Sequence, residues 1–180
     1  MDFVAQVSLA DPIAFSETFA MAYVFMCSET KCGTYDPTSG ANCVLLQTFT
    51  DDPFVATRNK QPMFGAYPDY VIESSVAIEP DIQTADFRGD WSIREQVHSR
   101  TKIGGVPFWF QANDWPDCHY CGGKTRFIAQ FNAEVDGPRP VGAYDDEDHY
   151  ILNFGDVGTG YLFLCADTCC DVGAAFLWQS

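Results

Sequence analysis

Hydrophobic residues along this chain come in short runs of strand length, and the clearest of them alternate. In residues 23–27 (YVFMC), Tyr23, Phe25 and Cys27 share one face of an extended chain, because side chains alternate with a period of two. Similar runs occur at residues 3–6, 127–130, 161–165 and 177–179. Aromatic and aliphatic residues dominate them, which is typical of β-strands bounded by turns. The pattern predicts a mainly β fold.

Three of these motifs occur twice, in the same order. Residues 3–6 (FVAQ) match residues 127–130 (FIAQ), residues 23–27 (YVFMC) match residues 161–165 (YLFLC), and residues 45–47 (LLQ) match residues 177–179 (LWQ). Three matches in order indicate an internal duplication. We therefore predict two related antiparallel β units, residues 1–50 and residues 102–180, packed into one globular domain that spans residues 1–180.

Residues 51–101 connect the two predicted units. This segment contains four prolines, but it is rich in apolar residues, so we expect it to fold onto both units. Helical signals are few. Asp11 followed by Pro12 is typical of a helix start and predicts a short helix that ends near Phe19, and residues 92–99 are a second candidate. Residues 103–111 are predicted to be a loop that enters a strand.

The charge of the chain narrows the classes of partner. The 180 residues include 25 Asp and Glu against 10 Lys and Arg, a net charge of −15, and 47% of them are hydrophobic. This composition is that of a globular protein, and its charge argues against nucleic acid or an anionic membrane as partner. A basic protein is favoured instead. With no basic leader and no apolar run of membrane-helix length, we expect a cytoplasmic protein.

Eight cysteines without an export signal are more typical of thiols or metal ligands than of disulfides. The sharpest motif is Cys118-x-x-Cys121 followed by two glycines, because two thiolates at this spacing can bind one tetrahedral ion. Cys165 with either Cys169 or Cys170 offers a second pair, and four such sulfurs would form a closed structural zinc site. We favour Cys170 as the fourth ligand, because it follows its motif at the same distance as the second cysteine of the first unit.

The other cysteines and the histidines leave alternatives open. Buried or free thiols and a redox dithiol compete with the zinc site, and a second metal site is not expected, because Cys27, Cys32 and Cys43 lack a Cys-x-x-Cys partner. A catalytic pair of Cys118 or Cys169 with His149 is conceivable. No flanking sequence is typical of a catalytic cysteine, so we do not predict an enzyme.

Two groups of residues are candidates for partner binding. The acidic run Asp145, Asp146, Glu147 and Asp148 lacks the spacing of a calcium loop and lies in a connection that is longer in the second unit than in the first. A long loop that the repeat does not need is a candidate binding element. Trp109 and Trp115 are the second group, because large aromatic side chains beside acidic surface can anchor a basic protein.

Five motifs follow one another in the second unit. In chain order they are Lys102-x-Gly104-Gly105-x-Pro107-x-Trp109-x-Gln111, Cys118-x-x-Cys121-Gly122, Phe127-x-Ala129-Gln130, Gly155-Asp156-x-Gly158-x-Gly160-Tyr161-x-Phe163-x-Cys165 and Phe176-x-Trp178-Gln179. Together these motifs resemble the YwqG-like family of bacterial proteins. The eukaryotic programmed-cell-death-protein-two and ribosome-maturation proteins are similar in the same order of motifs. The resemblance is strongest over residues 102–179 and weaker, through the repeat, over residues 3–47. It implies a duplicated, β-rich fold with no established enzyme activity.

The resemblance also implies a function in holding another protein. Eukaryotic relatives are thought to chaperone a basic ribosomal protein, and bacterial relatives are regarded as immunity proteins of polymorphic toxin systems. The first unit here lacks counterparts of the Gly-Gly-x-Pro and Cys-x-x-Cys segments, which suggests specialisation. Our first hypothesis is an immunity protein that inhibits a basic toxin, such as a nuclease, by direct binding. A chaperone-like module for a basic ribosomal or nascent protein is the second hypothesis, and a cysteine-dependent enzyme is the third.

Overall fold

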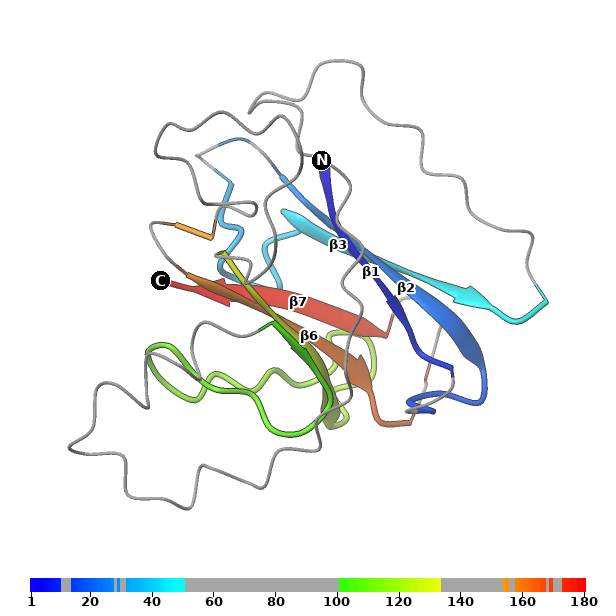
Figure 1. The fold of residues 1–180 in the computed structure, drawn as a ribbon. Coiled ribbons are helices and arrows are strands. Elements are labelled where there is room, and N and C mark those ends of the chain that lie inside the picture. The colour runs from blue at the N-terminus through cyan, green and yellow to red at the C-terminus, as the bar shows by residue number, and fades with distance from the viewer. Residues whose placement is uncertain are drawn as a thin grey trace, which may run out of the picture.

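Two antiparallel sheets make up the described part of the molecule (Figure 1). The computed structural model describes residues 1–10, 14–27, 29, 32–50, 101–133, 154–155, 158–167, 169 and 173–180. One sheet contains β1 (Asp2–Ser8), β2 (Phe19–Met26) and β3 (Asn42–Thr48), in that order. The other contains β4 (Lys102–Ile103), β5 (Thr125–Asn132), β6 (Thr159–Cys165) and β7 (Ala174–Gln179), also in that order. The mainly β prediction is confirmed.

The two sheets repeat the same strand pairing residue by residue. Equivalent rows of paired residues cross both sheets, Gln6–Tyr23–Leu45 in the first and Gln130–Tyr161–Leu177 in the second. A β-bulge lies at the same place in the matched motif of β1 and of β5. The motifs matched in the sequence are therefore equivalent positions of two three-stranded units.

The hydrophobic core lies between the two sheets, whose strands cross obliquely in Figure 1. Buried side chains from both sheets form one cluster, which includes Val7, Val24 and Val44 from the first and Ile128, Leu162 and Phe176 from the second. Each such side chain contributes about 1.5–3 kcal/mol when it is fully buried. Because both units supply this cluster, each of them covers the apolar face of the other.

Polar contacts also tie the loop between β2 and β3 to β7. The Asn42 side-chain amide donates hydrogen bonds to the carbonyls of Thr34, at 2.6 Å, and of Phe176, at 2.9 Å. The indole N–H of Trp178 donates to the Thr34 hydroxyl at 2.9 Å. The ring of Tyr35 meets the Trp178 ring edge-on, with 6.3 Å between centroids. This loop is therefore part of the contact between the two units.

The predicted helix before Phe19 is wrong as far as the described residues reach. Residues 14–18 are not helical, and Phe19 is the first residue of β2, where it pairs with Thr48. The Ser16 hydroxyl accepts hydrogen bonds from the N–H groups of Thr18 and Phe19, so it organises a turn. Ala14 has a φ of +49°, which lies outside the right-handed helical region, and the Ser16 N–H donates to the Leu9 carbonyl at 3.1 Å, so the chain turns here instead of forming a helix. Residues 92–99 lie outside the described residues.

A covering segment, residues 107–112, lies across the outer face of the second sheet without joining it as a strand. Side chains of the sheet hold its main chain instead. The Gln130 and Gln179 side-chain oxygens accept from the N–H groups of Phe108 and Gln111, and the Tyr161 hydroxyl accepts from that of Phe110. The prediction of a strand here is therefore wrong, because residues of β5, β6 and β7 supply side chains rather than main-chain groups as partners.

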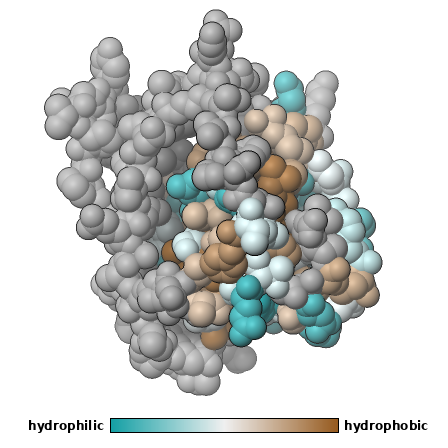
Figure 2. Space-filling model, turned by 90° about the vertical axis from the view of Figure 1, so that its right-hand side faces the viewer, coloured by the Kyte–Doolittle hydropathy of each residue, from teal (hydrophilic) through white to brown (hydrophobic). Residues whose placement is uncertain are grey.

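The described surface combines hydrophilic and hydrophobic side chains. On the face drawn in Figure 2, hydrophobic residues reach the surface between hydrophilic ones. The large hydrophobic side chains that are exposed are Met1, Phe3, Tyr35, Leu45, Phe49, Trp115 and Tyr120. Within the described ranges, no helix has the length and apolar character that crossing a membrane requires.

Candidate metal centre

Four cysteine sulfurs gather at one end of the second sheet. The Sγ atoms of Cys118, Cys121, Cys165 and Cys169 all lie within 4.8 Å of one another. Cys118 is 3.6 Å from Cys169, and Cys121 is 3.7 Å from Cys165, measured between Sγ atoms. Four sulfurs placed tetrahedrally at about 2.3 Å from a zinc ion are about 3.8 Å apart. The two printed separations are close to this value and the others do not exceed 4.8 Å, so the four sulfurs are within the distance that a bound metal ion requires.

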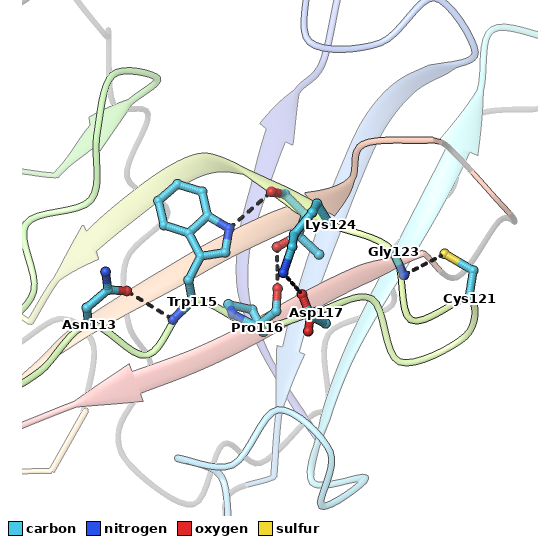
Figure 3. Close-up of polar contacts among 8 residues, drawn as sticks. Asn113, Trp115, Pro116, Asp117, Cys121, Gly123 and Lys124 are labelled. Carbon is cyan, nitrogen blue, oxygen red and sulfur yellow. Dashed lines mark hydrogen bonds and ion pairs between the residues drawn. The ribbon is translucent and has the colours of Figure 1, made fainter.

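The first two sulfurs are presented by a tight hairpin that precedes β5. Asp117 and Lys124 form an isolated bridge at its base, where the Lys124 ammonium also pairs with the Asp117 carboxylate at 2.8 Å (Figure 3). At its tip, Gly122 N–H donates to the Cys118 carbonyl at 2.8 Å. Gly122 has a φ of +68°, in the left-handed region that favours glycine. The turn thus requires the glycine that follows the second cysteine.

Gly123 has a different role in the same hairpin. Its N–H donates to the Cys121 sulfur at 3.3 Å. Figure 3 draws this contact between the two residues. A Cβ atom at Gly123 would lie 3.1 Å from that sulfur and 3.2 Å from a carboxylate oxygen of Asp167. Glycine at this position allows the main chain to approach the sulfur closely, and an N–H donor directed at sulfur favours the thiolate that a metal needs.

The other two sulfurs come from the end of β6 and the loop after it. Cys165 is the last residue of β6 and pairs with Thr125, the first residue of β5. The N–H of Ala166 donates to the Lys124 carbonyl at 2.9 Å, so the loop that carries Cys169 stays beside the hairpin. Antiparallel pairing of β5 with β6 therefore brings together cysteines that are 44 residues apart in the chain.

The pKa values of the cysteines are shifted by one another and by main-chain N–H groups. Burial raises the pKa of the Cys165 thiol, but hydrogen bonds from the N–H groups of the following loop and from Cys169 and Cys121 outweigh it and lower that pKa to about 7. For Cys121, the Gly123 N–H lowers the pKa, whereas Cys118, Cys165 and desolvation raise it, and the net shift is upward. A cluster with these opposed shifts has one thiol poised to ionise first.

The fourth member of the described cluster is Cys169. The sequence left Cys169 and Cys170 as alternatives, and the repeat favoured Cys170, which lies outside the described residues. Cys169 was a candidate ligand because it lies close to Cys165 in the sequence. The cluster buries Cys118 and Cys165 and exposes Cys121 and Cys169. A tetrahedral ion bound by these four sulfurs would have its coordination complete.

The predicted partner-binding residues lie in different surroundings. The acidic run, residues 145–148, lies outside the described residues. Trp109 is half-buried and stacks on Phe163, with 5.9 Å between centroids and 13° between planes. Trp115 meets both rings edge-on, donates its indole N–H to the Thr125 carbonyl at 3.0 Å and remains 40% exposed. Trp109 thus contributes to the packing of the covering segment, and Trp115 reaches solvent beside the hairpin.

Comparisons with protein-family models, with curated proteins and with solved structures found no match to this chain. The resemblance to YwqG-like proteins therefore stays a prediction drawn from the order of short motifs.

Proposed function

We propose that this protein is a zinc-stapled binding protein for a basic partner, and specifically an immunity protein that inhibits a cognate basic toxin. The observation that carries the proposal is the cluster of four sulfurs beside an exposed aromatic surface. The net charge of −15 supports the choice of a basic partner. The toxin as partner rests on the resemblance to bacterial immunity proteins.

The metal centre is proposed to be structural rather than catalytic. Four protein sulfurs complete the coordination of a tetrahedral ion and leave no position for water or substrate, whereas catalytic zinc sites keep one open. Zinc would then tie the hairpin of Cys118 and Cys121 to the loop after β6. Such a tie would hold the exposed side chains of the hairpin in fixed positions for binding.

The hairpin and its neighbours offer a surface suited to a basic protein. Tyr120, at the tip between the two cysteines, is 59% exposed, and Trp115 lies in the segment that leads into the hairpin. Asp114 and Asp167 are also exposed. Exposed Tyr and Trp are frequent binding hot spots, and acidic side chains around them speed the encounter with a basic partner and select for it.

Capture of partners from the native host tests this function. Tagged full-length protein would be washed at low and at high salt, and bound proteins would be identified by mass spectrometry. A single basic, stoichiometric partner with a toxin activity that this protein inhibits is the expected result. Capture of nascent chains or of a ribosomal protein would reject the immunity function, and the absence of any partner at either salt would reject protein binding altogether.

A pair of variants tests the proposed surface. Tyr120→Ala should weaken binding of the captured partner at least tenfold, because a hot-spot aromatic contributes about 2 kcal/mol or more. Tyr35→Ala is the matched control, since Tyr35 is 63% exposed but belongs to the loop between β2 and β3. Equal loss of affinity in both variants would reject the hairpin as the binding surface.

A chaperone-like function is the second candidate, and the covering segment favours it. The second sheet holds an extended segment through side chains that bind its main chain, and main-chain recognition tolerates many sequences. A protein that can hold an extended segment of its own chain has chemistry suited to holding one from another chain. Binding of unfolded peptides from a basic ribosomal protein, in place of a folded toxin, would support this function over the first.

A further inference from the structure

The first unit contains a pair of cysteines in unusually close contact. The Sγ atoms of Cys27 and Cys32 are 2.7 Å apart. This is closer than the sulfur pairs of the metal centre, at 3.6 Å and 3.7 Å, which a central ion could separate. A disulfide bond is about 2.05 Å long, so only a small movement of either side chain separates this pair from bonding distance.

The surroundings of the pair suit thiol chemistry better than metal binding. Among the described residues, only the four-cysteine group of the second unit gathers three or more ligands of a metal ion. The first unit has no counterpart of the Cys-x-x-Cys hairpin, so the sulfurs that complete the site in the second unit have no equivalent here. Cys27 and Cys32 are both half-buried, which leaves them accessible to a small oxidant.

We propose that Cys27 and Cys32 form a reversible disulfide by exchange with a low-molecular-weight disulfide such as oxidised glutathione. One protein thiolate attacks a glutathione sulfur, which breaks the glutathione disulfide and releases one glutathione thiolate that takes up a proton. The second protein thiol, after losing its proton, attacks the mixed disulfide and releases the second glutathione. Two protein thiols are oxidised to one disulfide, and one glutathione disulfide is reduced to two thiols.

The position of the pair couples this reaction to the contact between the units. Cys27 follows β2, and its N–H donates to the Ala41 carbonyl at 2.8 Å, just before β3 begins. Cys32 lies two residues before Thr34, which contacts both Asn42 and Trp178. A disulfide would therefore fix the start of the loop that joins the first unit to β7. Oxidation would stabilise this joint, and reduction would release it.

Differential thiol labelling tests the proposal. Zinc-loaded full-length protein would be equilibrated in glutathione buffers of increasing oxidising power, its free thiols would be alkylated, and the labelled peptides would be mapped by mass spectrometry. Cys27 and Cys32 should become protected together as one internal disulfide, while Cys43 remains free. In Cys32→Ser, Cys27 can no longer complete the exchange, so its glutathione adduct should accumulate at least tenfold above the wild-type level.

Other outcomes would overturn the proposal. Persistence of glutathione adducts on the wild-type cysteines, or no reaction at either of them when Cys43 reacts, would show that the pair does not close. Thermal melting of the wild-type protein is a second test, and it does not require the Cys32→Ser variant to fold. Oxidised wild-type protein should melt about 5 °C above the reduced protein, and Cys43→Ser should retain this difference, because it leaves the pair intact. Equal melting temperatures would show that the loop is not fixed by oxidation.

Discussion

Removal of the metal should lower the free energy of unfolding by an amount that depends on the length of the chain segment between the ligands. The proposed zinc site links Cys121 to Cys165, which are 44 residues apart. In the chain-entropy account of cross-links, closing a loop of this length stabilises the folded state by about 4 kcal/mol. Chelation should therefore cost about 4 kcal/mol, and for a protein of this size that corresponds to a fall in Tm of about 8–16 °C.

Cys169→Ser separates the effect of the metal from the effect of the side chain. Cys169 is exposed, so in chelated protein the substitution should cost less than about 0.5 kcal/mol. In zinc-loaded protein the same substitution removes a ligand and should cost several kcal/mol. Cys43→Ser is the control, because Cys43 lies outside the cluster and its substitution should cost the same in both forms.

Denaturant unfolding with and without chelator, together with metal analysis of protein purified without chelator, provides the measurement. The expected result is one zinc ion per chain and a cost of Cys169→Ser that depends on the metal. If Cys169→Ser costs the same in both forms, or if chelation leaves unfolding unchanged, the four sulfurs do not act as a metal staple.

Four further predictions concern the two sheets. Tyr161→Phe should lower the free energy of unfolding by about 2 kcal/mol in chemical denaturation, because it removes two hydrogen bonds to the covering segment. In the wild type, an ultraviolet titration should find one tyrosine with a pKa of about 12. The contribution of Tyr161 to stability should therefore be lost as the pH rises from 10 to 12. Gly160→Ala should cost several kcal/mol in chemical denaturation, since a Cβ atom would lie 2.6 Å from the Phe176 ring. Asn42→Asp should cost about 2–4 kcal/mol at neutral pH in the same assay, because a carboxylate would face two carbonyl oxygens. In metal-free protein, the Cys165 pKa of about 7 lies below the ordinary value of 9.0, so the free energy of unfolding should rise between pH 7 and pH 9. Denaturant unfolding measured across this pH range should show no such rise in Cys165→Ser.

Much of the fold could be predicted from the sequence, because it depends on local and repeated patterns. The period of two in residues 23–27 and 161–165 predicted the strands that became β2 and β6, and the repeated motifs predicted the strands that pair with them. A repeated motif implies a repeated environment, so the match of motifs anticipated the match of strand pairing. The glycines after Cys121 likewise indicated a tight turn, since left-handed backbone is a local requirement.

Only the tertiary structure decided which distant groups meet. The cysteine motifs identified candidate ligands, and the spacing in the repeat favoured Cys170 over Cys169. Antiparallel pairing of β5 with β6 brings the two cysteine segments together, and in the structure Cys169 lies beside Cys118. The helix predicted before Phe19 did not form in residues 14–18, where the Ser16 N–H bonds to the carbonyl of Leu9, seven residues earlier. The role of Trp109 was likewise set by packing on Phe163. The local sequence pattern thus determined the strands and the candidate ligands. Long-range strand pairing and burial determined which side chains share a site.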